Sequence, residues 1–600
     1  MLGCALLGAA CDAADATTPP SFGAGGFATA GASSGGAVTT GGVGVGAQPV
    51  VCSAEPLPFP PVRYSVADID GSLDLVFGEG TPRLADLGEH DRAGYDRHLS
   101  PQFITALLSV ARERVKEAAL TVCSFEEDAL CMELWLRTYA DQLYRRPLTQ
   151  AQVDAFTVPF LGVESDEARQ EVAVDVLAAM VLSPYFLLRL EASAPGGRIS
   201  THDVASRLAH LATRRVPDAE LRARAQSEEL YDPLVRLAEL HRLWQTPAGQ
   251  AARELQMLEW LGIDRLPAQV DDEWQAQARR FITQVYEEES GSFSAFFTSS
   301  RLPLNDRLAE RYGLSLPGTE QLEPVELDPQ LFAGLLSTGA FLTRYPGPSQ
   351  RGTAIMSTLF CVDVPVPPGS HVNEPLPVAE TPRLRIQAAT AGSAGCVPCH
   401  DAIDPPGFAL EAFDAQGRLS GFPTHGALRT SLTGPSGAVS GPVALGRVAT
   451  SSLVSHDCLS QRSLEFVSQR EISFDFAARL LAPPDEAPEL QWQRCLTNTL
   501  GGQEPSLTVL METLAASDLM LARDDEPRRV VALDTSQDPI EHAYQEALQL
   551  RDAYAQDGVM LIPQYLSALR QLQDTAAPIG GAGSGGDSGD AGSGGAGGAP

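Results

Sequence analysis

Between two glycine-rich ends, apolar residues recur at helical intervals along most of the chain, and this repeat restricts the fold more than any other feature. In residues 132–143, for example, Met132, Leu136, Tyr139 and Leu143 share one helical face. Alternation of apolar and polar residues, the pattern typical of strands, is scarce. We therefore expect an all-α protein built from several small helical modules in series.

Local signals mark where these helices begin and end. Ser124 with Glu127, and Thr149 with Gln152, have the spacing of a capping box, which satisfies the first unpaired N–H groups of a helix. Pro184 is expected to interrupt or end the helix before it, because proline lacks an N–H group. The sequence predicts these segments: a truncated export signal (1–11), a disordered linker (12–50), a reduced N-terminal helical module (51–120), further helical modules (121–195 and 196–318), a cytochrome-c-like haem-attachment module (319–422), a C-terminal helical module (423–535), terminal helices (536–579) and a disordered tail (580–600).

The two ends have compositions that exclude a packed core. Residues 12–48 and 580–600 are mostly glycine and other small residues, which bury too little apolar area to offset the entropy of ordering. Residues 1–11 are apolar, with small residues before Cys11, and resemble a bacterial lipoprotein signal that would make Cys11 the lipidated residue. The alternative is a buried apolar N-terminal segment. We expect an exported, lipid-anchored protein of the cell envelope with no other membrane contact.

Charge excludes several classes of function. The chain has 43 Lys and Arg against 76 Asp and Glu, a formal net charge of −33. Nucleic-acid binding needs clustered positive charge to displace counterions, so we expect no nucleic-acid partner. Lys116 is the single lysine in the sequence, and we set aside Schiff-base chemistry and a phosphate-binding loop.

Residues 396–400 form a Cys-x-x-Cys-His motif, the attachment signature of c-type haem. On a helical turn Cys396 and Cys399 face the same way, so both sulfurs can bond to the vinyl groups along one porphyrin edge. His400 then lies beneath the ring as the proximal iron ligand. We expect one covalent haem c. Because this attachment takes place outside the cytoplasm, it agrees with the export signal.

Two other interpretations of the motif fit the sequence less well. A thioredoxin-like redox pair also has Cys-x-x-Cys, but it normally follows a strand in a βαβ unit, and no such pattern precedes Cys396. A structural zinc site needs about four ligands, and the sequence has no second pair at a recognised spacing. Haem attachment is therefore the preferred interpretation.

The residues after the motif predict its surroundings. Pro405 and Pro406 are expected to end the motif helix abruptly. An apolar wall near the haem is expected from Phe408, Leu410, Phe413 and Phe422. The acidic set Asp401, Asp404, Glu411 and Asp414 has the composition to bind calcium or move protons, although caps, turns and a solvated face explain it more simply. Arg145 and Arg146 are candidates for a haem propionate contact or, more simply, for ion pairs between modules.

The sixth iron ligand has several candidates. Met356 lies upstream on a helix expected over residues 353–360, near Cys361, although a core role is the simpler explanation for a helical methionine. His371 lies in a proline-rich extended segment, His425 in a loop flanked by glycine, and His456 further along. An open or water-bound position is the remaining alternative. The choice matters because a methionine raises the potential, whereas an open position permits ligand binding.

Six cysteines remain outside the leader and the motif, and an even number in an exported chain suggests three disulfides. We predict Cys123–Cys131 and Cys458–Cys495 as local bridges, which leaves Cys52–Cys361 by elimination. The alternative is that several of these residues are buried thiols.

The chain resembles a family of large, exported bacterial proteins built from consecutive domains of unknown function, the fifteen-eighty-eight and fifteen-ninety-two series. The resemblance covers about residues 61–522, and the segment from Cys396 to Arg418 is its most specific part. Its other markers are Tyr144–Thr149, Leu182–Leu187, Ala205–Leu208, Pro303–Leu308 and Arg351-Gly352. The resemblance implies an exported helical protein with a c-type haem and no established substrate. An arginine-led helix expected near residues 61–75 is degraded, so the first domain is a reduced version.

Three functions fit this sequence. The first is an envelope protein that carries one covalent haem and takes part in electron transfer or an associated oxidation, with an unidentified redox partner. The second is a binding or adhesion lipoprotein whose haem module is structural or vestigial. The third is an envelope hydrolase, for which no carboxylate pair can be chosen from 76 acids without geometry.

Overall fold

The computed structural model describes residues 52, 63–87, 100–124, 129–191, 193–194, 198–266, 272–315, 318–364, 378–390, 396–422, 424–428, 437–469, 472, 488–500 and 505–522. These residues are mostly helical, which confirms the all-α prediction. The strands within these ranges form three two-stranded antiparallel ribbons: β1 (Ser193–Ala194) with β2 (Arg198–Ile199), β3 (Arg301–Leu304) with β4 (Glu323–Glu326), and β5 (His425–Leu428) with β6 (Gly437–Ser440). Within the described part of the chain, no helix is both long and apolar enough to cross a membrane. The expected leader, the linker at 12–50, the terminal helices and the tail lie outside the described residues.

The chain divides into two compact units, residues 61–190 with 526–600 and residues 191–525 with 1–60. The described helices of the first unit are α1 (Val66–Phe77), η1 (Ala85–Leu87), α2 (Pro101–Arg114), α3 (Lys116–Ala119), α4 (Ala129–Leu143), α5 (Gln150–Thr157), η2 (Val158–Phe160), α6 (Asp166–Leu182) and α7 (Pro184–Leu187). In α4 the predicted face is buried at Met132, Leu136 and Leu143. The capping box of Thr149 and Gln152 begins α5 as expected. Pro184 separates α6 from α7, while the expected box at Ser124 and Glu127 reaches outside the described residues.

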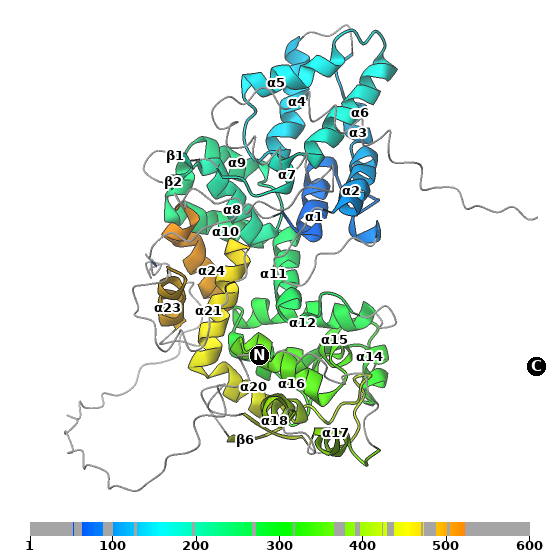
Figure 1. The fold of residues 1–600 in the computed structure, drawn as a ribbon, viewed down its shortest axis with the longest axis vertical. Coiled ribbons are helices and arrows are strands. Elements are labelled where there is room, and N and C mark those ends of the chain that lie inside the picture. Colours follow the sequence, from blue (N-terminus) through cyan, green and yellow to red (C-terminus); the bar gives the residue numbers. More distant parts are fainter. Residues whose placement is uncertain are drawn as a thin grey trace, which may run out of the picture. The chain divides into compact units, whose positions relative to one another are not determined.

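The second unit holds most of the described helices. Its first part comprises α8 (Thr201–Thr213), α9 (Ala219–Gln226), η3 (Glu229–Tyr231), α10 (Pro233–Trp244), α11 (Pro247–Trp260), α12 (Asp272–Glu289), α13 (Phe293–Thr298), α14 (Asp306–Tyr312), η4 (Gly334–Ser337) and α15 (Gly339–Arg344). It continues with α16 (Pro348–Phe360), α17 (Pro382–Thr390), α18 (Val397–Phe408), α20 (Pro442–Thr450), α21 (Leu453–Ser468), α23 (Pro488–Leu500), α24 (Leu507–Ala516) and η5 (Asp518–Met520). The helices α21 and α24, near the end of the described chain, pack against α8 at the start of this unit. Figure 1 shows α21 in yellow and α24 in orange beside the green α8. One apolar cluster runs through this unit, from Leu208 in α8 to Met356 in α16 and Leu514 in α24.

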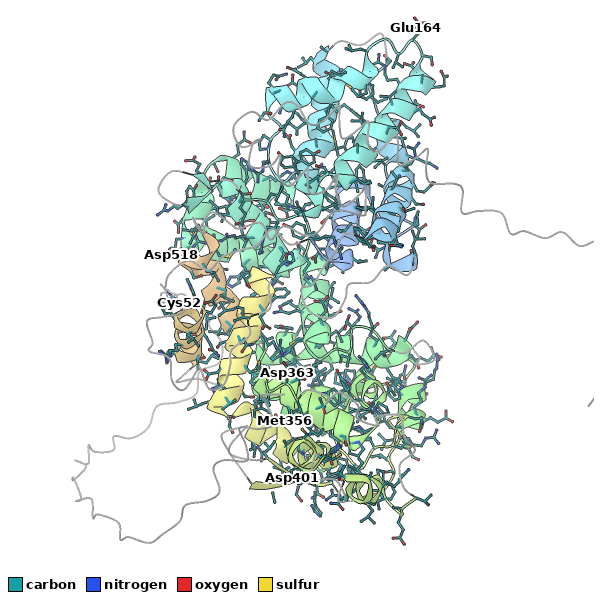
Figure 2. The ribbon with its side chains drawn as sticks, in the orientation of Figure 1. Cys52, Glu164, Met356, Asp363, Asp401 and Asp518 are labelled. Atoms are coloured by element: carbon teal, nitrogen blue, oxygen red, sulfur yellow. A yellow bond between two sulfur atoms is a disulfide. The ribbon has the colours of Figure 1, made fainter. Side chains whose placement is uncertain are left out.

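The six cysteines outside the leader and the motif form three disulfides. Cys123–Cys131 is present as predicted. The other two predicted bridges are wrong, because the structure pairs Cys52 with Cys495 and Cys361 with Cys458. The sequence predicts Cys458–Cys495 because both lie in nearby helical regions. In the structure α21 packs on both α16 and α23, but Cys458 faces the end of α16, where its Sγ lies 3.5 Å from the Thr358 carbonyl and Cys361 is the C-cap residue. The helix packing, which sequence spacing does not reveal, therefore decides the partners. Cys52, labelled in Figure 2, is fully buried against α23 through its bridge to Cys495.

Candidate functional site

The first turn of α18 brings the motif residues together. Cys396 is the N-cap residue of α18, and Cys399 and His400 lie in the turn that follows. The His400 N–H donates to the Cys396 carbonyl at 3.1 Å, which shows the i, i+4 geometry of a helical turn. All three side chains are partly exposed, and Cys396 and Cys399 are thiols outside the three disulfides. Two sulfurs and one imidazole thus share one accessible turn, as the spacing predicts.

His400 is held in one orientation by a carboxylate on its own helix. Its Nδ1 lies 3.1 Å from both carboxylate oxygens of Asp404, which is 5% exposed. The Ser349 hydroxyl, from α16, donates to Oδ1 of Asp404 at 2.6 Å. The hydrogen bond with Asp404 raises the pKa of His400 above its ordinary value, although burial opposes it. Because Nδ1 is engaged by Asp404, Nε2 is the nitrogen available to an incoming metal.

A close crossing of α16 and α18 fixes the position of this turn. A Cβ atom added at Gly352 would overlap the carbonyl oxygen of Ile403, and one at Gly407 would overlap the carbonyl oxygen of Pro348. Only glycine permits the two backbones to approach so closely. The contact explains why α18 continues through Pro405 and Pro406 to Phe408, against the expected abrupt end. Packing against α16 outweighs the hydrogen bonds that the two prolines remove.

A buried arginine secures the end of the same helix pair. Arg351, 1% exposed, donates through Nη1 to the carbonyls of Leu410 at 2.9 Å and Phe413 at 2.7 Å. Its other nitrogens donate to the carbonyls of Tyr345 at 2.9 Å and Asp414 at 2.6 Å. Burial lowers the pKa of Arg351 to about 10, so the side chain stays charged at neutral pH. The arginine of the Arg351-Gly352 marker therefore anchors the backbone that follows α18, and the glycine permits the crossing.

The acidic residues near the motif have separate roles. Glu411, 3% exposed, accepts from the Arg383 backbone N–H and Nε, each at 2.9 Å, and so joins α17 to the end of α18. Asp414 accepts from the backbone N–H groups of Gln416 and Arg418 in a turn, while Asp401 is exposed. Across the described ranges, no three His, Cys, Asp or Glu side chains form a cluster suited to a metal ion.

The aromatic residues after the motif belong to the protein core. Phe408 is 5% exposed and Phe413 3% exposed. Phe413 makes edge contacts with Tyr312 and Phe332, with ring centroids 6.2 Å and 5.3 Å apart. Arg383 lies over the Phe408 ring at 4.3 Å. The expected apolar wall is thus packed into the core of the unit, whereas Phe422 is half-buried.

The structure places three of the four candidates for the sixth ligand. Met356 is 1% exposed in α16, within the apolar cluster, and Figure 2 labels it together with Asp401 of the neighbouring α18. His425 begins strand β5 instead of lying in a loop, and its Nδ1 is 2.9 Å from Ser440 Oγ. His456 lies on α21 and donates through Nε2 to the Thr450 carbonyl at 2.8 Å. His371 lies outside the described residues, as does Cys11.

Arg145 and Arg146 have backbone partners in the first unit. Arg145 donates to the carbonyls of Tyr185 and Phe186 at 2.9 Å and 2.8 Å. Arg146 donates to the Leu190 carbonyl at 2.9 Å. These bonds tie the turn after α4 to α7 and the residues that follow it.

The sequence analysis names Asp404 only as a member of the acidic set, without its contact with His400, and it does not name Ser349. The spacing of His400 and Asp404 at i and i+4 places them on one helical face, and this signal was available in the sequence. Ser349 carries no comparable signal, because its contact with Asp404 depends on how α16 crosses α18.

The donor set matches what a c-type haem requires, namely two thiols for thioether bonds and one imidazole with Nδ1 occupied. Comparison with known proteins gives two matches to family models. Residues 199–314 match PSD4, described as Protein of unknown function (DUF1592), and residues 333–421 match PSCyt3, described as Protein of unknown function (DUF1588). The two matches lie in series, as the resemblance implies, and the second contains the whole motif. No curated protein and no solved structure matches the chain.

Proposed function

We propose that this chain is an exported envelope protein that carries one covalent haem c and takes part in electron transfer or an associated oxidation. The observation that carries the proposal is the first turn of α18, where Cys396, Cys399 and His400 are partly exposed together and Asp404 holds Nδ1 of His400. Neither a binding lipoprotein nor a hydrolase has a comparable observation in its favour.

Each residue of the turn has a role in this proposal. Cys396 and Cys399 would hold the porphyrin edge through thioether bonds, and His400 would offer Nε2 to the iron. Asp404 keeps the imidazole in the tautomer with its proton on Nδ1. The bound haem would supply one-electron chemistry at its iron. The glycine crossing packs the backbone of α18 directly against α16, which lies in the core of the unit.

A pyridine haemochrome spectrum with stoichiometry tests the proposal on full-length protein matured in a haem-attaching host. We expect one haem per chain, retained on a denaturing gel, and none in the Cys396→Ala/Cys399→Ala protein. Cys123→Ala/Cys131→Ala is the matched control, because it removes two cysteines from the other unit and should keep the haem. Wild-type protein that matures without haem would overturn the proposal and favour the binding or hydrolase functions.

The sixth ligand separates an electron carrier from an oxidising enzyme. Tight binding by Met356 or by one of His371, His425 and His456 prevents carbon monoxide from binding the ferrous protein at neutral pH. Rapid, stoichiometric binding would instead indicate an open position and favour ligand activation. Loss of the near-infrared methionine–iron band in Met356→Ala would identify Met356 as the ligand.

The proposal includes a lipid anchor at Cys11. Several acyl chains together bind a membrane firmly, whereas one chain binds only marginally. The Cys11→Ser protein should therefore move almost completely from the membrane to the soluble fraction. Unchanged partition would contradict lipidation at Cys11.

A further inference from the structure

A buried carboxylate lies behind the imidazole of His400 and is itself held by a hydroxyl from another helix. Both oxygens of Asp404 lie 3.1 Å from Nδ1 of His400, and Ser349 Oγ donates to one of them at 2.6 Å. Asp404 is 5% exposed, so its charge is largely removed from water. The result is a chain of three polar groups that begins on α16 and ends at Nδ1 of His400.

The backbones hold this chain of groups in place. Ser349 follows Pro348 at the start of α16, next to the point where Gly407 contacts the Pro348 carbonyl. Asp404 follows Ile403, whose carbonyl contacts Gly352. Both members of the Ser349–Asp404 bond thus adjoin backbone contacts that leave no room for a Cβ atom. The hydroxyl and the carboxylate are brought together by the crossing and not by side-chain flexibility.

We infer that Asp404 and Ser349 are positioning residues that set the electron-donating strength of His400 toward iron, and this inference rests on the proposed function. A carboxylate that accepts the Nδ1 proton makes the imidazole a stronger donor at Nε2, which favours ferric over ferrous iron. The Ser349 hydroxyl withdraws part of the carboxylate's negative charge and so limits that effect. The two residues act on His400 in opposite directions, and the net bias is toward the oxidised state.

Reduction potentials of the haem-loaded variants test this inference. We expect Asp404→Asn, which keeps the shape and an acceptor oxygen but removes the charge, to shift the ferrous-to-ferric ratio at least tenfold toward ferrous iron. For a one-electron couple this corresponds to a potential raised by about 59 mV or more. Ser349→Ala should lower the potential by a smaller amount, because the carboxylate then attracts the Nδ1 proton more strongly. Asp401→Asn removes an exposed charge next to His400 and is the matched control, expected to shift the ratio less than twofold.

A second readout reports on the bond itself. Resonance Raman spectroscopy of the ferrous protein should show the iron–histidine stretch at a lower frequency in Asp404→Asn and at a slightly higher frequency in Ser349→Ala. A merely structural role would not produce shifts of opposite sign in two variants of one hydrogen-bond chain.

The outcomes separate this inference from the proposed function. If wild-type protein carries haem but the potential of Asp404→Asn moves no more than that of Asp401→Asn, the inference is wrong and the proposed function stands. If Asp404→Asn does not fold, Ser349→Ala decides alone, and an unchanged or raised potential in it overturns the inference. Wild-type protein without haem overturns both.

Discussion

Two helix pairs in the second unit, α10/α24 and α16/α18, are each held by a buried arginine that donates to backbone carbonyls, but their packing contacts differ. In the α10/α24 pair, Arg236 is 1% exposed and donates to the carbonyls of Ala515 and Ala516 at 2.7 Å each. In the α16/α18 pair, Arg351 does the same for carbonyls beyond α18. Neither arginine forms an ion pair among the described residues. Arg236 thus caps the end of α24, and Arg351 binds the backbone that follows α18, each with a desolvated charge.

The contact surfaces of these pairs are different. Leu240, Leu243, Leu510 and Leu514 place apolar side chains in the core around α10 and α24. The α16 and α18 backbones meet directly at Gly352 and Gly407. A surface of side chains can adapt by changing rotamers, whereas a backbone contact cannot. The helix that carries the motif is therefore held more rigidly than a helix that only completes the core.

Gly352→Ala should have the largest effect, because it removes the direct backbone contact that distinguishes the α16/α18 pair from the α10/α24 pair. The new Cβ overlaps the Ile403 carbonyl, a backbone atom that cannot rotate away. We expect the free energy of unfolding to fall by more than about 4 kcal/mol, with loss of the native helix pair. Urea unfolding followed by circular dichroism measures it.

The control for this variant is Gly347→Ala at the N-cap of the same helix. There the nearest atom to the added Cβ is the side-chain oxygen of Gln350, at 3.2 Å, which can move. We expect a loss below about 1 kcal/mol. Equal losses at positions 347 and 352 would show that the close crossing does not matter.

Arg236→Met and Arg351→Met should each lower the free energy of unfolding by about 3 to 5 kcal/mol, because each leaves several buried carbonyls without a donor. Thermal unfolding of the two proteins measures the loss. The haem spectrum of the folded fraction is a second measurement, which distinguishes the effects of the two arginines on the motif helix. We expect it to change in Arg351→Met and to stay native in Arg236→Met. Identical spectra in both would indicate that the end of α18 does not depend on Arg351.

Removal of the Cys361–Cys458 disulfide should cost about 2 to 4 kcal/mol. The bridge joins the end of α16 to α21 and spans 97 residues. Cys361→Ser/Cys458→Ser should therefore lower the urea midpoint, and we expect hydrogen exchange to quicken in α16 and α21 more than in α10. Equal acceleration in all three helices would contradict a local role.

The smallest expected effects depend on pH and have opposite signs in the two regions. In haem-free Cys396→Ala/Cys399→Ala protein, the hydrogen bond to Asp404 raises the pKa of His400. The pair therefore stabilises the fold below the unfolded-state pKa of about 6.5, and this contribution is lost as pH rises through the raised value. Since His400 is 32% exposed, we expect less than about 1 kcal/mol. Urea midpoints of this protein with and without Asp404→Asn, at pH 5 and pH 9, measure it.

The ion pair between Asp218 and Arg242 of α10 changes its contribution to stability at acidic pH. Burial opposes ionisation of Asp218, but hydrogen bonds from Arg242 and from the Leu221 N–H outweigh it and lower the pKa of Asp218. The contribution is present above the unfolded-state pKa of about 3.9 and is lost as pH falls through the lower value. Asp218→Asn keeps a capping side chain at the start of α9. We expect it to lower the free energy of unfolding by less than about 1 kcal/mol at pH 6, and by a smaller amount at pH 3. A larger cost at pH 3 would reverse the sign and contradict the ion pair.

The comparison also shows what the sequence could predict. Helices defined by local patterns were predicted well, because periodicity, caps and prolines act within a few residues. Thus α4 has its predicted buried face, Thr149 caps α5, and Pro184 ends α6. The motif turn belongs to the same class, since its geometry follows from three nearby residues.

Features that depend on packing between distant segments were missed. The helix through Pro405 and Pro406, the partners of Cys52 and Cys361, and the Ser349–Asp404 bond all depend on which helices cross. Proline usually ends a helix, so the sequence did not predict that α18 continues through Pro405 and Pro406. Assigning Cys52 to Cys361 by elimination gave the wrong disulfides. The glycine next to His425 predicts a loop, whereas pairing with β6, which begins nine residues after β5 ends, makes His425 the first residue of a strand.

The Cys52–Cys495 bridge has a consequence for the order in which the chain is made. Its two cysteines are 443 residues apart, so at typical synthesis rates Cys52 waits roughly 20 to 90 s for its partner. Cys123, Cys131, Cys361, Cys396, Cys399 and Cys458 all emerge during that interval. Six other cysteines of the body, two of them in the motif, are therefore made before the partner of Cys52. The correct bridge then forms only if Cys52 is still reduced when Cys495 becomes available, or if an early mispaired disulfide is rearranged.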